Sequence, residues 1–220
     1  MLRVESGPAG PVVAGELPPG TTAYVDADWL PPEGPVPALV RTGDGMLRWL
    51  DGEPVPEPPG LAPDAAAALA LLAVAWAAAA AAGPVGPDSV RVEGRGLIAD
   101  SIRRRLGLGR SGPLQGRSPA VVVDASGDPR TIEEATHHLR NLGTLVIVGQ
   151  EAGRPLDLNL YRDVHKRGLR LVGIAPPLAG PLPAPAPDER AAAETAAAAV
   201  GPSRLGQPLT GTHLWYRFSA

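Results

Sequence analysis

The stretch VRVEGRGLIADSIRRRLG, Val90 to Gly107, decides how the rest of the chain is interpreted. A short apolar strand runs into two glycines, and a helix with a basic end follows. This order is typical of the loop that begins a dinucleotide-binding unit. Such a unit has a second strand about twenty residues later, which ends in an acid for the cofactor ribose. Here that place holds GRSGPLQGRSPA, Gly109 to Ala120, which has no acid and is barely long enough for a strand.

The loop itself follows the pattern G-x-G-x-x-A at Gly94, Gly96 and Ala99. In a working loop the first glycine permits the tight turn, and the second lets the backbone approach a pyrophosphate. The alanine allows the helix to pack closely on the strand, and the helix start at Leu97 offers N–H groups to the anion. The alternative is that these residues serve strand–helix packing alone. The pattern leaves both interpretations open.

Apolar strands alternate with helices after this loop. Short apolar runs at 119–127, 143–150 and 168–174 are typical of strands that are buried in a parallel sheet. Helical segments at 131–141 and 159–166 separate them. This alternation predicts an α/β fold with a parallel sheet and right-handed crossovers.

The carboxyl ends of these strands predict a ligand crevice. In open parallel sheets, ligands bind beyond the carboxyl ends of the strands. Together with the glycine loop, the residues at those ends are the candidate cofactor-binding set: Gly94, Gly96, Ala99, Asp124, Ser126, Gly127, Val148 and Gly149. Catalytic residues are not assigned. Tyr161, Tyr216 and His213 are candidate proton donors without a geometry that ties them to the crevice.

We expect three segments. Residues 1–60 read as a small β-rich lobe, with strands at 10–17, 21–27, 37–43 and 45–52, and residues 61–175 as the nucleotide-binding domain. Residues 176–220 read as a Pro/Ala-rich connector, a helix and a last strand that packs back on the N-terminal lobe. The apolar segment Ala65–Ala82 could be mistaken for a membrane span, but Asp64 as N-cap and Gly83 as C-terminal stop favour a buried helix.

The composition excludes several classes of function. A net charge of −3 and a pI near 5.8 argue against nucleic-acid binding, which normally needs a basic face. The arginines 103–105 are interpreted as a helix C-terminus that suits the dipole. There are no cysteines, which excludes disulfides and thiolate metal sites. With no secretory signal visible, a cytoplasmic protein is expected.

Three phrases together resemble a known family: VRVEGRGLIADSIRRRLG, AVVVDASGDPRTIEEATHHLRNLGTLVIVGQ and LDLNLYRDVHKRGLRLVGI. They are similar to the cofactor domain of medium-chain dehydrogenase/reductases, in the zinc-type alcohol, polyol and threonine dehydrogenase branch. The likeness runs from about Val55 to Ile174. It implies a reduced Rossmann-like parallel sheet, with residues 1–60 as the remnant of a GroES-like domain, and NAD(P)(H) as cofactor.

The chain departs from the family at the metal and at the adenosine half of the cofactor. The N-terminal lobe has no cysteine and no histidine before His137, and adjacent histidines 137 and 138 point about 100° apart on a helix, so no zinc is expected. The family's second and third nucleotide strands have no counterpart between Leu106 and Pro119. Arg110 and Arg117 stand in that gap, as solvated loop residues or as partners of a 2′-phosphate.

Two hypotheses of function follow. The first is a zinc-independent NAD(P)(H)-linked oxidoreductase of specialised metabolism, acting on a small hydroxyl or carbonyl metabolite or on a modified peptide. The second is a catalytically inactive, dehydrogenase-like scaffold or regulatory subunit. In the family the last strand of the sheet pairs across a two-fold axis. The resemblance therefore implies a homodimer through Gly168–Ile174, or a heteromer with a full-length dehydrogenase.

Overall fold

The computed structural model describes residues 2–30, 34–49, 53–108, 118–148, 156–174 and 184–219. The chain divides into two compact units. The first comprises Met1–Ala73 and Pro176–Ala220, and the second comprises Val74–Ala175. The first unit therefore combines both ends of the chain, and the second contains the glycine loop.

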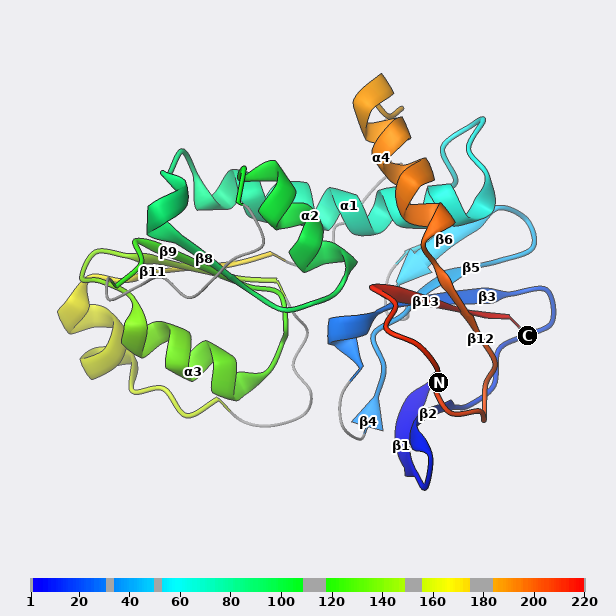
Figure 1. The fold of residues 1–220 in the computed structure, drawn as a ribbon, viewed down its shortest axis with the longest axis horizontal. Helices are drawn as coiled ribbons and strands as arrows, with labels where there is room; N and C mark the ends of the chain where they lie inside the picture. Colours follow the sequence, from blue (N-terminus) through cyan, green and yellow to red (C-terminus); the bar gives the residue numbers. More distant parts are fainter. Residues whose placement is uncertain are drawn as a thin grey trace. The chain divides into compact units, whose positions relative to one another are not determined.

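The first unit contains two sheets (Figure 1). Their strands pair antiparallel, except that β12 and β13 pair in parallel. A small sheet has the order β2-β1-β4, and a larger one has the order β12-β13-β3-β5-β6-β7. Turns that follow each short strand make these hairpins, as the many glycines and prolines predict. The strands are β1 (Arg3–Gly7), β2 (Gly10–Ala14), β3 (Thr22–Asp26), β4 (Gly34–Pro35), β5 (Leu39–Arg41), β6 (Met46–Trp49), β7 (Val55–Pro56), β12 (Gly201–Ser203) and β13 (Trp215–Ser219).

β13, near the C-terminal end of the chain, lies inside the larger sheet, between β12 and β3. β13 pairs antiparallel with β3 along five residues, from Trp215 opposite Asp26 to Ser219 opposite Thr22. Its aromatic side chains supply the burial: Trp215 and Phe218 are 0% exposed, and Trp215 stacks on Tyr24 with ring centroids 5.6 Å apart. Trp215 Nε1 donates to the carbonyl of Ala196 in α4 (Pro187–Ala198), 3.0 Å away, which holds this helix on the sheet.

A four-stranded parallel sheet forms the second unit, in the order β11-β10-β9-β8. It contains β8 (Val90–Glu93), β9 (Val121–Asp124), β10 (Thr144–Ile147) and β11 (Arg170–Gly173). The strands are in register, so that Glu93, Asp124, Ile147 and Gly173 form one row at their carboxyl ends. All four residues of β9 are buried, as expected for a strand covered on both faces. The predicted α/β fold, with a reduced Rossmann-like parallel sheet and a small β-rich lobe, is confirmed.

Helices of the second unit cover both faces of its sheet (Figure 1). α2 (Leu97–Arg105) packs on β8 from one side, and α3 (Pro129–His138) packs on β9 and β10 from the other. The chain steps the same way across the sheet from β8 to β9 and from β9 to β10. The β8–α2–β9 and β9–α3–β10 crossovers therefore have opposite handedness, because their helices lie on opposite faces of the sheet. The prediction that all crossovers are right-handed is wrong for one of the two.

The six-stranded order 3-2-1-4-5-6 explains this change of hand. In that order, strands 2 and 4 lie on opposite sides of strand 1. The helix after strand 1 connects it to strand 2, and the chain reaches strand 4 only after strand 3. Among the described residues, β8 pairs only with β9, and no strand lies beyond it. The arrangement is that of the larger sheet without its second and third strands, with the first helix kept on its original face.

The helix before β8 is α1 (Pro63–Ala82), which begins in the first unit and ends in the second. It is long and apolar enough to span a membrane, but 72% of its 18-residue apolar window is buried within the protein. Asp64 lies inside the first turn and not at the N-cap, because the helix already begins at Pro63. The Asp64 carboxylate instead accepts hydrogen bonds from Tyr24 and Arg217 of the neighbouring strands.

Between β10 and β11 the predicted short helix is irregular. A π-helical turn at Leu160–Val164 runs into a 3₁₀ turn at His165–Arg167. Asn159 caps the first turn by accepting from the N–H of Arg162, 2.9 Å away. Gly168 then ends the segment with φ +62°, where a Cβ would lie 2.7 Å from Leu142. The chain can reverse into β11 there only because this residue is glycine.

Candidate functional site

The glycine loop connects β8 to α2 by a three-residue turn. Gly94 has φ +113°, a region that residues with a side chain rarely adopt, so glycine is required at this position. Gly96 is the N-cap of α2, and Ala99 in its first turn is 0% exposed. A larger residue at 99 would push the helix away from the strand. The strand, turn and helix therefore have the form that the sequence pattern predicts.

Arg103 anchors this loop from the helix side. Its Nη2 donates to the carbonyl of Val92 at 2.9 Å and to the carbonyl of Gly94 at 2.5 Å. Arg104 pairs with Asp100 one turn earlier, 2.6 Å apart. The sequence interpretation gave all three arginines to the helix dipole, but Arg103 reaches the loop itself. The sequence shows the cluster of three arginines but not which of them binds the loop. Only the packing of α2 on β8 gives this role to Arg103.

At the end of β9, a buried carboxylate shapes the next part of the crevice. Asp124 is 0% exposed, and Ser126 Oγ donates to Oδ1 at 2.6 Å while the Gly127 N–H donates to Oδ2 at 3.2 Å. Burial raises the pKa of Asp124 to about 6, more than these hydrogen bonds lower it, and the charge of Glu93 adds to the increase. Asp124 thus fixes the turn at Ser126 and Gly127, and its carboxyl group titrates close to neutral pH.

Backbone bonds continue past the strands and bring the candidate residues together. The Ala125 N–H donates to the carbonyl of Glu93 at 3.1 Å, and the Val148 N–H donates to the carbonyl of Asp124 at 2.8 Å. Gly94, Ala125 and Val148 each follow a residue of the aligned row, so the ends of β8, β9 and β10 form one edge. Seven of the eight candidate residues lie at this edge: Asp124 ends β9, Ala99 is in the first turn of α2, and the other five are in the turns that follow the strands. Gly149 lies outside the described residues, as do Arg110 and Arg117.

The suggested proton donors lie elsewhere. Tyr161 is 62% exposed and stacks on His165, with ring centroids 5.3 Å apart. Tyr216 and His213 belong to the first unit, where their rings meet edge to face and the Tyr216 hydroxyl donates to the carbonyl of Gly211. None of these three tyrosine and histidine side chains is in the row of strand ends. The structure therefore adds no catalytic residue to the set.

Metal-binding groups are sparse in the described part of the chain. Within it, no three histidine, aspartate or glutamate side chains lie close enough together to hold a metal ion. His137 Nε2 is 4.0 Å from Asp163 Oδ1, but Arg162 already binds both oxygens of that carboxylate. The pair with Arg162 holds the pKa of Asp163 at about 2.

The loop suits the diphosphate part of a dinucleotide. Gly94 and Gly96 place no side chain between this turn and a large anion, and the positive end of the α2 dipole lies there. The described residues contain no second strand with an acid for the adenosine ribose. The fit is therefore to the diphosphate, and the adenosine half has no equivalent of the usual partner.

Comparisons with known proteins identify the fold. No family model matches the sequence, and no curated protein matches it. Solved structures do match over the whole chain. L-Idonate 5-dehydrogenase from Escherichia coli K-12 has a TM-score of 0.52 at 11% identity, with 100% of this chain and 99% of that chain covered.

Two further structures carry a bound dinucleotide. A short chain alcohol dehydrogenase (rspB) from E. coli CFT073, complexed with NADH, has a TM-score of 0.52 at 13% identity and covers 100% of this chain and 98% of its own. A protein described as a zinc-binding dehydrogenase, from Sinorhizobium meliloti 1021 and bound to NADP, has a TM-score of 0.50 at 15% identity, with both chains covered completely. The chain has the fold of the medium-chain alcohol and polyol dehydrogenases, and at these identities the likeness establishes the fold alone.

Proposed function

We propose that this protein is a zinc-independent oxidoreductase that binds NAD(P)(H) at the carboxyl ends of β8, β9 and β10. Its substrate would be a small hydroxyl or carbonyl compound, or a modified peptide that carries such a group. The observation that carries the proposal is the loop between β8 and α2. Gly94 at φ +113°, the N-cap Gly96 and the buried Ala99 stand at a strand end in a dehydrogenase fold.

The chain's own residues give this site a rigid floor. Arg103 fixes the carbonyl of Gly94, so the loop keeps its shape without a ligand. Asp124 holds Ser126 and Gly127, which form the adjoining wall. A bound nicotinamide would supply the hydride, which leaves the protein to orient the substrate and exclude water. Because a preformed loop loses little entropy on binding, it offsets part of the missing contact with adenosine.

Titration with NADH and with NADPH tests the proposal, with energy transfer from tryptophan as the signal. Half-saturation at about 1 mM or below is expected, since losing two or three hydrogen bonds would weaken a micromolar site by about a thousandfold. Gly96→Asp should abolish the signal, because its carboxylate would meet the diphosphate. Gly86→Asp is the matched control: Gly86 precedes β8 with an ordinary φ of −67° and has open space around its Cβ position.

Circular dichroism should show that both variants remain folded. Equal binding by wild type and Gly96→Asp would refute the site. The absence of any saturable signal from the wild type would refute cofactor binding. Binding by Gly86→Asp but not by Gly96→Asp supports the proposal.

A scaffold role has its own supporting observation at the other edge of the sheet. In the described part of the chain β11 pairs only with β10, and large apolar side chains are exposed around it: Leu142 by 81%, Leu160 by 66%, Tyr161 by 62% and Leu171 by 36%. Unpaired edges that carry apolar side chains are usually covered. We propose a homodimer in which β11 pairs antiparallel with its copy.

The composition of β11 suits this self-pairing. An antiparallel two-fold centred between Leu171 and Val172 sets Leu171 against Val172 and Arg170 against Gly173, so no like charges meet. Sedimentation at about 10 μM protein tests it. Leu171→Lys should produce monomers, whereas Ser118→Lys, which adds the same charge at an exposed position before β9, should not. A wild-type monomer would refute self-association, and capture of a full-length dehydrogenase would then identify a heteromer.

A further inference from the structure

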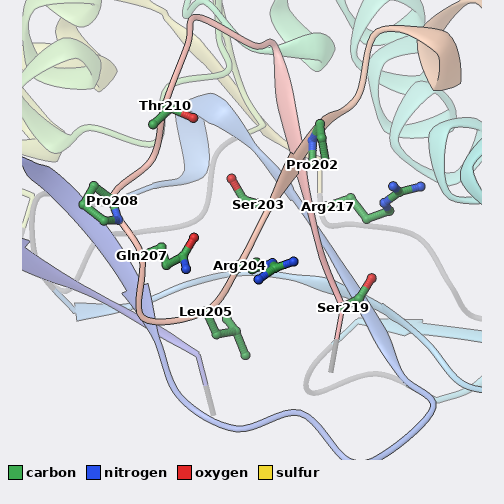
Figure 2. Close-up of a pocket in the computed structure, with 9 residues that line it drawn as sticks. All are labelled: Pro202, Ser203, Arg204, Leu205, Gln207, Pro208, Thr210, Arg217 and Ser219. Atoms are coloured by element: carbon green, nitrogen blue, oxygen red, sulfur yellow. The ribbon is translucent and has the colours of Figure 1, made fainter.

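A cavity lies in the first unit, in the part of the chain that holds no dinucleotide motif. It has a volume of about 700 Å³, is open to solvent on one side, and is bordered by β12, β13 and the loop that joins them (Figure 2). Volumes of 300–1,000 Å³ are typical of small-molecule sites. The lining residues are Pro202, Ser203, Arg204, Leu205, Gln207, Pro208, Thr210, Arg217 and Ser219.

The rim of this cavity is fixed by the neighbouring sheet. The Gly206 N–H donates to the carbonyl of Val13 at 2.9 Å, and the Leu209 N–H donates to the carbonyl of Pro11 at 3.0 Å. Pro208 forms a bridge with Val12 between these bonds. The loop thus extends the β2 hairpin, and its apolar residues Leu205 and Leu209 pack against the core. A ligand would therefore find this wall already formed.

The lining is polar and has one sign of charge. It contains two guanidinium groups, three hydroxyls and one carboxamide, and no acidic side chain. Figure 2 shows Gln207 and Thr210 reaching from the loop toward Ser203 on β12, with Arg204 on the side of Arg217 and Ser219. Guanidinium groups and hydroxyls together are the donors that bind carboxylates and phosphates.

The two arginines differ in how their charges are balanced. Arg217 Nη1 donates to Asp64 Oδ2 at 2.5 Å, and the buried Tyr24 hydroxyl donates to the other oxygen of this carboxylate at 2.7 Å. This network neutralises Arg217 and fixes its direction, while Nε and Nη2 remain for a second acceptor. Arg204 makes no ion pair with any residue that the structure describes. Arg204 is therefore the uncompensated positive charge of the cavity.

We infer that this cavity binds a small organic anion through a phosphate or carboxylate group. Arg204 holds the anionic group, Ser203, Gln207 and Thr210 add hydrogen bonds, and Arg217 orients it from the β13 side. The volume exceeds that of an inorganic ion, which leaves room for an organic body beside Leu205 and Pro208. The site is separate from the glycine loop and does not depend on cofactor binding there.

Calorimetric titration of the full chain with phenyl phosphate and with benzoate tests the inference, with neutral benzyl alcohol as the control ligand. At least one of the two anions should bind saturably in the millimolar range or tighter, and the stronger identifies the preferred group. Arg204→Gln should weaken that binding about tenfold or more, because it removes a charge-assisted contact. Thr210→Val should weaken it less, through one hydrogen bond.

Arg48→Gln is the matched control, since it removes an exposed arginine from β6 of the same unit without touching the cavity. Three results would overturn the inference. The first is that neither anion binds up to about 10 mM, a concentration beyond any useful affinity. The second is that benzyl alcohol binds as tightly as the anions. The third is that Arg204→Gln and Arg48→Gln weaken binding equally, which would indicate a diffuse charge effect. Selective loss in Arg204→Gln supports the site.

Discussion

Asp124→Asn should remove a pH dependence that the wild-type protein carries in its parallel sheet. The carboxyl group is buried, and its pKa lies at about 6 against 3.8 for an exposed aspartate. Between these values the folded protein binds more protons than the unfolded chain. The free energy of unfolding therefore decreases as the pH rises from about 4 to about 6, and this contribution is constant above that range.

The size of the effect follows from the shift. Two pKa units at about 1.4 kcal/mol each predict that the wild type loses roughly 3 kcal/mol across this window through Asp124. Asparagine has the same shape and no charge. Its carbonyl can accept from the Gly127 N–H, and its amide can donate to Ser126 Oγ, because a hydroxyl both donates and accepts. The variant should thus keep the turn while it loses the titration.

Urea denaturation at pH 4 and pH 7 measures this, followed by the methyl signals of Val122 and Leu145 in the core of the same unit. Relative to the wild type, Asp124→Asn should be about 3 kcal/mol more favourable at pH 7 than at pH 4. The other carboxylates titrate equally in both proteins and cancel in this difference. An identical pH dependence of the two proteins would refute the argument that burial raises the pKa of Asp124.

Three further substitutions probe the contacts that shape the two units. Gly94→Ala should cost about 1–2 kcal/mol, because φ +113° strains any side chain, and it should weaken NADH binding; an unchanged urea midpoint would contradict the strain. Arg103→Met should cost about 1–3 kcal/mol in the same assay by leaving two loop carbonyls without a donor, whereas Arg105→Met, at an exposed position, should cost little. Tyr24→Phe should lower the melting temperature through the loss of its bond to Asp64, and a drop as large in Tyr161→Phe, at an exposed position, would count against that reason.

Local sequence predicted the elements of the second unit well. The predicted helices and strands from Val90 onward match α2, β9, α3, β10 and β11 within about three residues at each end. Each is encoded locally, by an apolar run for a strand or by a cap such as Asp128 for a helix. In the first unit, four strands were not predicted: β1, β4, β7 and β12. They carry no run of β-branched residues, and three of them have only two or three residues, so their strand form depends on pairing with neighbours.

The candidate site shows where local reasoning ends. The strand-end residues could be chosen because parallel strands share one carboxyl edge, and the register of Glu93, Asp124 and Ile147 brings their neighbours together. The role of Arg103 could not be chosen, since Arg103, Arg104 and Arg105 are alike in sequence and differ only in the side of α2 they occupy. The cavity beside β12 could not be predicted for a related reason: its residues form no motif, and they meet only when β12 pairs with β13 and the loop between them binds β2.

By itself, the sequence determined the helices and strands of the second unit and the turn at Gly94, because apolar periodicity and glycine conformation act over a few residues. Tertiary structure alone decided that β8 is an edge strand among the described residues, that α2 and α3 cover opposite faces, and that Asp124 is buried beside Glu93. It also decided that β13 pairs with β3, nearly two hundred residues away, and so places Arg217 against Asp64. Burial and charge pairing depend on groups distant in the chain, so they exist only once the fold has formed.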